Sequence, residues 1–376
     1  MSTVNIRWIT TDAALSSACQ LWQKQPALAL DTEFIRVDTF YPIAGLIQVS
    51  DGQSSYLLDP LTIQDWRCFA AVLDNPNVVK ILHACSEDLE VLHRLVGTLP
   101  APLFDTQIAC SYLNIGFSLG YSRLVENLLG VHLDKDETRS DWLQRPLTAT
   151  QELYAAQDTL YLIEIYQRLQ AQLSAEKYLW VLADGEDLLA QHYVQSQTIA
   201  ERWKHIKLAW KLNAQQLAVL RAISQWREEL ARQRDVPRNR VLRENSLWEL
   251  AVQQPSDTGH LSRIPEVSPK TVRMDGDKLL KIISQAKALP KNQWPELLPE
   301  PLNVKEAKFY KKIRSAGNIV AEQLNVAPEI VLRKKIAEEI VRTWLKTGQI
   351  TLPDDLTGWR RAYLAPVLIE SLRDTQ

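Results

Sequence analysis

Short apolar runs, each the length of one β-strand, are confined to the first part of this 376-residue chain. They occupy residues 26–30, 46–49, 56–58 and 78–82. From Thr106 onward apolar residues recur at three- and four-residue spacing, which is typical of helices. The longest helix expected in the N-terminal half of the chain spans residues 148–173. Early strands followed by packed helices predict an α/β domain.

The remainder of the chain is predicted to be entirely helical, since no convincing strand pattern follows residue 184. A stretch rich in Pro and Glu at residues 289–301 predicts a linker between two helical units. Residues 236–243 resemble residues 326–333, and each segment follows a long predicted helix, which indicates a degenerate repeat. We therefore predict an α/β domain over residues 1–195 and two small all-α domains over residues 210–290 and 300–376.

The two halves of the chain carry opposite charge. Residues 1–200 contain 12 Lys and Arg against 24 Asp and Glu, whereas residues 201–376 contain 31 against 21. The overall net charge of −2 hides this difference. A basic half joined to an acidic half indicates that the basic part binds nucleic acid.

Other features of the composition exclude several classes of protein. No run of about 18 apolar residues predicts a membrane span, and residues 1–11 contain no apolar signal core. The four cysteines are scattered without a CxxC pair, which argues against a zinc ribbon and a disulfide framework. We expect a cytoplasmic protein, and a monomer because no apolar stripe is left over for an interface.

Four carboxylates and one phenol are expected beside strongly apolar elements. Asp31 and Glu33 follow a buried strand, and residues at i and i+2 of a strand point to the same face. Tyr154 and Asp158 share one face of a helix because they are four residues apart. Asp88 begins the helix after another buried strand. Clustered carboxylates repel one another unless cations lie between them.

Divalent metal ions are the partners that best suit these carboxylates. Mg²⁺ and Mn²⁺ prefer carboxylate oxygen and water, and the sequence contains no cluster of Cys and His that would indicate zinc. Two such ions about 4 Å apart can activate a water and stabilise the leaving oxygen of a phosphodiester. The sequence therefore predicts two divalent cations, Mg²⁺ or Mn²⁺.

These residues carry a resemblance to a known group of enzymes. Asp31-Thr-Glu33, Asp88 in the phrase His-Ala-Cys-Ser-Glu-Asp, and Tyr154-x-x-x-Asp158 resemble the three motifs of the DEDD superfamily of 3′→5′ exonucleases. Residues 29–34, 103–107 and 140–147 are similar, more narrowly, to the bacterial ribonuclease D family. The two helical units resemble the helicase-and-RNase-D C-terminal (HRDC) domains that this family carries in tandem.

The resemblance implies a ribonuclease H-like nuclease domain that releases nucleoside 5′-monophosphates from the 3′ end of RNA, with precursor transfer RNA as a substrate. It implies that Asp31, Glu33, Asp88 and Asp158 bind the two metal ions, and that Glu33 and Tyr154 orient the attacking water. One branch of the superfamily has His at the position of Leu153. Tyr154 instead identifies the tyrosine branch.

Further side chains are candidates for contact with the substrate. Phe34 could stack on a terminal base, His83 could contact the substrate, and Trp142 could shape the mouth of the site. For each of these, a purely structural role is an open alternative. Arg238 and Arg240 belong to a basic cluster that is predicted to bind phosphates of the RNA.

Two other functions remain open at this point. A DNA exonuclease of the proofreading type would use the same carboxylates, because selection of RNA depends on contacts to the 2′-OH that the sequence does not locate. The second alternative is an RNA-binding protein with a degenerate nuclease domain, although all four acids and the tyrosine are present. Activity on matched RNA and DNA would separate these possibilities.

Overall fold

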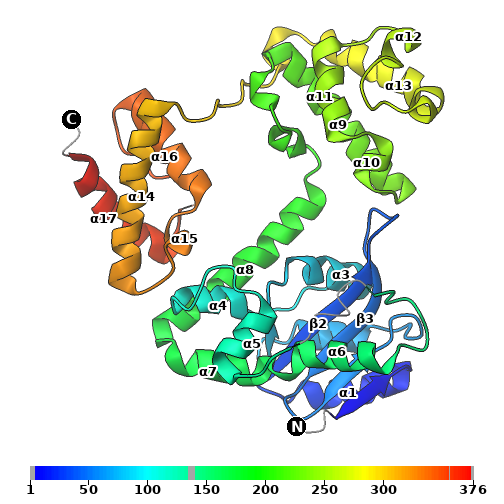
Figure 1. Cartoon of the computed structure of the whole chain (residues 1–376), viewed down its shortest axis with the longest axis vertical. Helices are drawn as coiled ribbons and strands as arrows, with labels where there is room; N and C mark the ends of the chain where they lie inside the picture. The colour runs from blue at the N-terminus through cyan, green and yellow to red at the C-terminus, as the bar shows by residue number, and fades with distance from the viewer. Residues whose placement is uncertain (1–4, 134–139, 355, 374–376) are drawn as a thin grey trace. The chain divides into compact units, whose positions relative to one another are not determined.

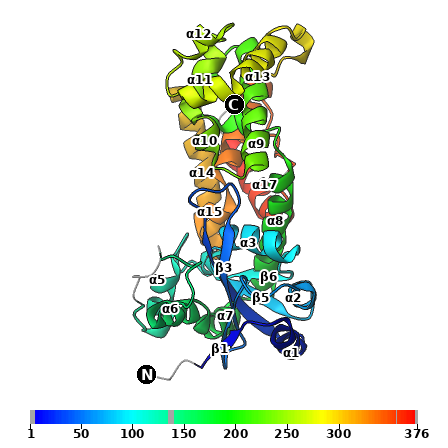
Figure 2. The same ribbon diagram turned by 90° about the vertical axis from the view of Figure 1, so that its right-hand side faces the viewer.

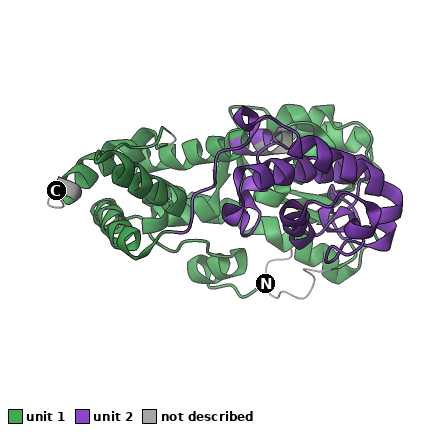
Figure 3. Ribbon diagram, turned by 90° about the horizontal axis from the view of Figure 1, so that it is seen from above, with its two compact units in different colours: residues 1–35, 44–190, 302–376 green, residues 36–43, 191–301 purple. Residues whose placement is uncertain are grey.

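The computed structural model describes residues 5–133, 140–354 and 356–373. The chain divides into two compact units, which Figure 3 shows in different colours. Unit 1 comprises residues 1–35, 44–190 and 302–376, and unit 2 comprises residues 36–43 and 191–301. The outer ends of the predicted first and third domains, residues 1–4 and 374–376, lie outside the described residues. No helix in the described part combines the length and hydropathy needed to cross a bilayer.

A six-stranded mixed sheet forms the centre of the N-terminal part of unit 1 (Figures 1 and 2). Its strand order is β1-β4-β3-β2-β5-β6. β1 is parallel to β4, and β5 is parallel to both β2 and β6, whereas β3 runs antiparallel to β4. The strands are β1 (Ile6–Ile9), β2 (Ala27–Ile35), β3 (Ile43–Ser50), β4 (Ser55–Leu58), β5 (Val79–Leu82) and β6 (Leu103–Asp105).

The two faces of β2 pack into different hydrophobic clusters. Leu28 and Leu30 join a cluster with residues of α1, α2 and α3, and Ala27 and Ala29 join a cluster with residues of α4, α5 and α7. Both faces of the strand are therefore covered, which explains its continuous apolar sequence. These helices are α1 (Asp12–Trp22), α2 (Arg67–Leu73), α3 (Ser86–Val96), α4 (Thr106–Tyr112), α5 (Tyr121–Leu129), α6 (Ala149–Leu160), α7 (Leu162–Gln172) and α8 (Ala175–Gln197), which continues into unit 2.

The C-terminal helices of unit 1 pack on the same body as the sheet. Arg360 and Asp184 form a bidentate ion pair with two N–O distances of 2.7 Å, and the rings of Trp180 and Trp359 stack with centroids 4.6 Å apart. The apolar cluster of α4 and α7 extends into these helices. They are α14 (Val304–Leu324), α15 (Pro328–Val331), α16 (Lys334–Thr347) and α17 (Gly358–Arg373).

Unit 2 consists of helices packed around a separate hydrophobic core. Residues 36–43, which join β2 to β3 along the chain, belong to this unit, and Phe40 is buried in its core. The elements are η1 (Arg202–His205), η2 (Ala209–Lys211), α9 (Ala214–Arg234), α10 (Arg238–Val241), α11 (Glu244–Gln253), α12 (Thr258–Leu261), α13 (Pro269–Lys287) and η3 (Lys291–Gln293).

The helices of the two C-terminal regions begin and end at matching positions. Asn213 and Asn303 both form capping boxes, and Asp235 and Asn325 both end a long helix in the left-handed conformation. Asn303 lies 90 positions after Asn213, and Asn325 lies 90 positions after Asp235. The sequence parallel between residues 236–243 and 326–333 thus coincides with a repeat of local structure.

The structure confirms the four predicted strands and differs from the sequence prediction in three places. β1 and β6 were not predicted. The helix expected over residues 148–173 is interrupted at Tyr161, which separates α6 from α7. The longest helix of the N-terminal half is α8, with 23 residues.

Candidate metal centre

Three carboxylates meet where β2 lies against α6. Asp31 and Glu33 occupy the odd positions of β2, and Asp158 lies in the last turn of α6. One carboxylate oxygen from each residue lies within 4.8 Å of the others. This arrangement satisfies the i, i+2 geometry predicted for the strand and brings in a third ligand from a helix.

Asp88 approaches this group from α3. Its Oδ1 accepts a 2.6 Å hydrogen bond from the hydroxyl of Thr32, which lies between Asp31 and Glu33 on β2. Thr32 lies two and four residues after Leu30 and Leu28, so its side chain points to the same face of the sheet as theirs. That face is the one covered by α3. Asp88 is not one of the three carboxylates grouped within 4.8 Å. Its negative charge nevertheless raises the pKa of all three.

The pKa values of the four carboxyl groups show how unfavourable this arrangement is without a cation. Burial, followed by repulsion from the neighbouring carboxylates, raises the pKa of Asp31 well above its usual range and that of Glu33 to about 9. Burial is also the main cause that raises the pKa values of Asp88 and Asp158 to about 7. Hard divalent cations bind carboxylate oxygens and offset such repulsion, so the residues fit a divalent metal centre.

Tyr154 lies one helical turn before Asp158 on α6, so the two side chains share a face of the helix. Its ring packs against a small buried cluster and lies 6.1 Å from the ring of Trp142 between centroids. Trp142 is only 2% exposed. The structure thus places Trp142 beneath Tyr154, and its predicted contact with substrate stays a prediction.

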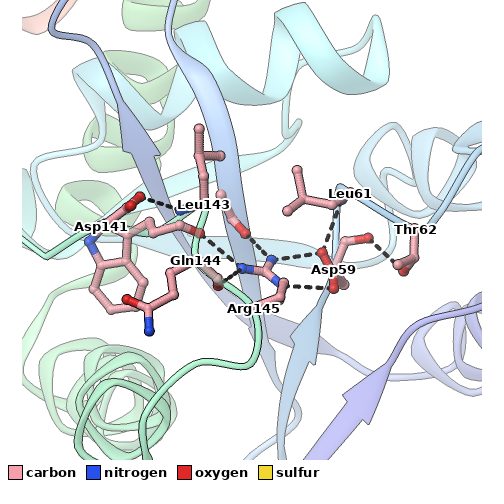
Figure 4. Close-up of polar contacts among 9 residues, drawn as sticks. Asp59, Leu61, Thr62, Asp141, Leu143, Gln144 and Arg145 are labelled. Atoms are coloured by element: carbon pink, nitrogen blue, oxygen red, sulfur yellow. Dashed lines mark hydrogen bonds and ion pairs between the residues drawn. The ribbon is translucent and has the colours of Figure 1, made fainter.

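The turn that contains Trp142 is fixed by Arg145 (Figure 4). The guanidinium of Arg145 donates to both carboxylate oxygens of Asp59 at 2.8 and 2.7 Å, and to the carbonyls of Gly45 and Trp142 at 2.7 and 3.0 Å. Burial acts to raise the pKa of Asp59, but the hydrogen bonds from Arg145 and from the amide of Leu61, together with the charge of Arg145, outweigh it and the pKa is lowered. Gly45 leaves room for this turn, because a Cβ there would lie 2.6 Å from the Cβ of Trp142.

The other predicted contacts lie in different surroundings. His83 follows β5, and its Nδ1 lies 2.8 Å from the hydroxyl of Thr106; burial lowers its pKa. Phe34 is partly exposed on β2, next to Glu33. Arg238 and Arg240 lie in unit 2, where they pair with Glu228 and Asp38. Their contacts with substrate stay predictions.

Two supporting residues escaped the sequence analysis. Tyr121 on α5 donates its hydroxyl to the carbonyl of Gln157 at 2.8 Å and so holds α6 beside Asp158. Asp105 accepts hydrogen bonds from the amides of Ala84 and Cys85, in the turn that leads to Asp88. Both contacts join segments distant in sequence, and only the phrase 103–107 gave any signal for Asp105.

Two carboxylates on β2, one on α6 with Tyr154, and Asp88 held beside them from α3 form the arrangement expected of a DEDD-type 3′→5′ exonuclease. In agreement, a family profile described as "3'-5' exonuclease" matches residues 6–174, and the HRDC domain profile matches residues 216–283.

Relatives similar over nearly the whole chain extend this assignment. Ribonuclease D of Pseudomonas paraeruginosa is 52% identical over 98% of this chain and 97% of its own length. Ribonuclease D of Escherichia coli is 38% identical over 99% of both chains. The chain belongs to the ribonuclease D family. This confirms the predicted family, the α/β domain followed by a helical region, and the enzyme class, a 3′→5′ exoribonuclease.

Solved structures agree with the sequence comparisons. The crystal structure of Escherichia coli RNase D, described as an exoribonuclease involved in structured RNA processing, superposes with a TM-score of 0.87 at 37% identity over 99% of both chains. The catalytic core of RRP6 from Trypanosoma brucei gives a TM-score of 0.56 at 25% identity and covers 77% of this chain and 82% of that one. The similarity to the bacterial enzyme therefore includes both units of the chain.

Proposed function

We propose that this enzyme removes nucleoside 5′-monophosphates from the 3′ end of RNA with two divalent cations, Mg²⁺ or Mn²⁺. The observation that carries the proposal is the meeting of Asp31, Glu33 and Asp158 within 4.8 Å, with Asp88 held beside them. When bound, the cations supply an activated water and stabilise the charge that develops on the leaving oxygen.

Each protein group has a separate role in the proposed reaction. Asp31, Glu33 and Asp158 would hold the cation that serves the attacking water, and Asp31 would also contribute to holding the second cation. Asp88 would support the second cation. Glu33 and Tyr154 orient the water by hydrogen bonds, since a phenol with an ordinary pKa near 10 positions water better than it removes a proton.

The proposed substrate is RNA with a free 3′ end, of which precursor transfer RNA is one class. The 31 basic residues of the C-terminal half support this proposal, because they suit a phosphate backbone. The Escherichia coli relative is described as acting in structured RNA processing. We further propose that the protein acts as a cytoplasmic monomer, with a nuclease domain at residues 1–195 and helical domains at residues 210–290 and 300–376.

The test is hydrolysis of a 5′-labelled RNA with a 3′ extension, in Mg²⁺ or Mn²⁺ and in EDTA. We expect a ladder that shortens from the 3′ end, that disappears in EDTA, and that Asp88→Asn slows by about 10²–10³-fold, the scale on which loss of an electrostatic contributor acts. Glu87→Gln is the matched control, because Glu87 is exposed on the same turn of α3. A DNA of the same sequence tests the proofreading alternative, and tight binding without hydrolysis would favour a degenerate nuclease.

A further inference from the structure

Unit 2 contains a pocket of about 310 Å³ that the catalytic proposal does not use. It opens between the segment 36–43 and the helices α9 and α10. Its size lies at the lower end of the roughly 300–1,000 Å³ typical of ligand pockets. The lining residues are Arg36, Val37, Thr39, Phe40, Arg227, Pro237, Arg238, Asn239 and Glu244. Three arginines against one glutamate make this lining positive.

Arg227 is the most unusual residue of the lining. It is only 7% exposed, its Nη1 donates to the carbonyl of Leu242 at 3.3 Å, and its Nε has no hydrogen-bond partner. Among the described residues it forms no ion pair. Burial, followed by repulsion from Arg238, lowers its pKa to about 10, so the guanidinium stays charged at neutral pH. Burial of a charged group without a counter-charge and with an unpaired donor costs free energy, and a bound anion would offset that cost.

The other two arginines are held in fixed positions. Arg238 donates to both carboxylate oxygens of Glu228 at 2.5 and 2.8 Å and lies 4.5 Å above the ring of Phe40. Arg36 donates twice to the carbonyl of Phe40. Because these contacts restrict the side chains before any ligand arrives, little conformational entropy is lost when an anion binds. Glu228 is also contacted by Arg202 and Arg232, so its single charge is shared among three arginines.

The helical repeat has the same local structure without the arginines at positions 227 and 238. At the positions 90 residues later, Arg227, Glu228 and Arg238 correspond to Gly317, Asn318 and Pro328. The carbonyl of Leu332, which corresponds to Leu242, accepts its hydrogen bond from Arg314. The second helical region thus has the same local pattern without these charged residues at the three positions.

We infer that this pocket binds a phosphate group of the RNA chain, with Arg227 as the central donor and Arg36 and Arg238 as its walls. The inference rests on the proposed function and deepens it, because it assigns one fixed phosphate contact to the first helical region. Charge-assisted bonds from guanidinium to phosphate are short and directional, and Arg227 lines the pocket with a guanidinium that no carboxylate of the described residues pairs with.

The test measures binding of a fluorescent single-stranded RNA by anisotropy in an Asp31→Asn background with Mg²⁺ present. Arg227→Met should weaken binding by about 10-fold and reduce the salt slope by about 1. Arg263→Met is the matched control, since Arg263 is an exposed arginine of the same unit that does not line the pocket. If both variants lose the same RNA affinity, the loss is explained by the change in net charge alone, and the inference is overturned.

A second pair of variants covers the case in which Arg227→Met fails to fold. Asn239→Glu places a negative charge on an exposed lining residue, and Gln233→Glu makes the same change on α9 outside the lining. Only Asn239→Glu should weaken RNA binding. Equal affinities for the two variants would overturn the inference, whichever way Arg227→Met behaves.

Two further measurements separate this inference from its alternatives. Titration with inorganic phosphate and with adenosine monophosphate tests for a free-anion site, and anion binding that depends on Arg227 without any change in RNA affinity would overturn the assignment to RNA. Hydrolysis by the unmodified enzyme is measured alongside. If that enzyme neither binds nor hydrolyses RNA, the proposed function fails; if it does both and the pocket variants match their controls, only the pocket inference fails.

Discussion

The side chains of β2 serve different purposes on its two faces. Asp31 and Glu33 point to the face where Asp158 completes the carboxylate group, and Thr32 points to the opposite face and holds Asp88. Alternation along one strand therefore places the two proposed metal ligands on one face and the residue that orients a further acid on the other. Thr32 is a positioning residue because it acts through Asp88.

Removal of the Thr32 hydroxyl should weaken metal binding. Thr32→Val keeps the shape of the side chain but loses the 2.6 Å hydrogen bond, so the affinity for Mn²⁺ is expected to fall about 10–100-fold, as for other outer-sphere partners of metal ligands. Thr32→Ser retains the hydroxyl and should restore the affinity. Titration of Mn²⁺ followed by electron paramagnetic resonance measures this directly. Equal affinities in the Val and Ser variants would assign Thr32 to packing alone.

The stability of the metal-free protein should depend on pH. The pKa values of Glu33, Asp88 and Asp158 are raised to about 9, 7 and 7 in the folded state, whereas unfolded carboxyl groups titrate near 4. The folded state therefore binds more protons between these values, and the free energy of unfolding falls as the pH rises from about 4 to about 9.

Melting temperatures in EDTA at about pH 6 and about pH 9 test this dependence. We expect a lower melting temperature at the higher pH, a smaller difference with Mg²⁺ or Mn²⁺ present, and a smaller difference in Asp158→Asn. Titration elsewhere in the protein affects the variant equally. If the variant and the unmodified protein lose stability in parallel, the carboxylates are not the cause.

At the scale of elements, the support of α6 depends on contacts between the turn just before it and residues far away in sequence. Arg145 connects the turn at residues 141–145 to Asp59, just after β4, and to Gly45 on β3. The side chain of Trp142, in the same turn, packs next to Tyr154. The position of Tyr154 is thus linked to two segments of the sheet, β3 and the end of β4.

Arg145→Lys should loosen this turn, because lysine keeps the charge but cannot form the bidentate pair. We expect a loss of about 1–3 kcal/mol in the free energy of unfolding and a lower kcat, with metal affinity unchanged. Arg67→Lys is the matched control, since Arg67 forms the same kind of pair with Asp65 on the exposed surface. Urea denaturation and single-turnover hydrolysis provide the two readouts. A similar response of both variants would argue against the role of the turn.

Local rules explain which elements and ligands the sequence predicts. Asp31, Glu33 and the pair Tyr154 and Asp158 follow from spacings of two and four residues, which depend only on their own element. β6 has only three residues, and β1 is a strand with alternating burial at the sheet edge, so neither forms a long apolar run. No Gly or Pro marks the break at Tyr161. The links from Thr32 to Asp88 and from Tyr121 to Gln157 arise only from tertiary packing.

At the scale of the whole molecule, the C-terminal helices of unit 1 are attached by a buried ion pair. The side chains of Arg360 and Asp184 are 12% and 7% exposed, and the hydroxyl of Tyr112 donates to Asp184 at 2.8 Å. The stacked rings of Trp180 and Trp359 lie beside this group. Because the sequence separates these residues by 176 positions, nothing in the local pattern predicted the contact.

Arg360→Met should detach this helical region, because it leaves the carboxylate of Asp184 buried without its cation. Loss of one partner of such a pair costs about 3–5 kcal/mol, whereas replacement of both is much better tolerated. The double variant with Asp184→Leu should therefore recover most of the loss. Hydrogen exchange in residues 302–373 measures the detachment, and Arg361→Met serves as the exposed control. Unchanged exchange in Arg360→Met would refute this role.

The segment 36–43 has a practical consequence for any attempt to divide this enzyme. It lies between the two strands β2 and β3, yet Phe40 is 4% exposed within the core of unit 2, and its amide donates to Asp235 at 3.0 Å. A shortened protein that ends near residue 195 would lack the core in which Phe40 is buried. The ring would then be exposed to solvent, in an aggregation-prone loop that directly follows the strand of Asp31 and Glu33. Unit 1 comprises three stretches of sequence and unit 2 comprises two, so no single cut along the chain separates the two units, and we expect that they have to be produced as one protein.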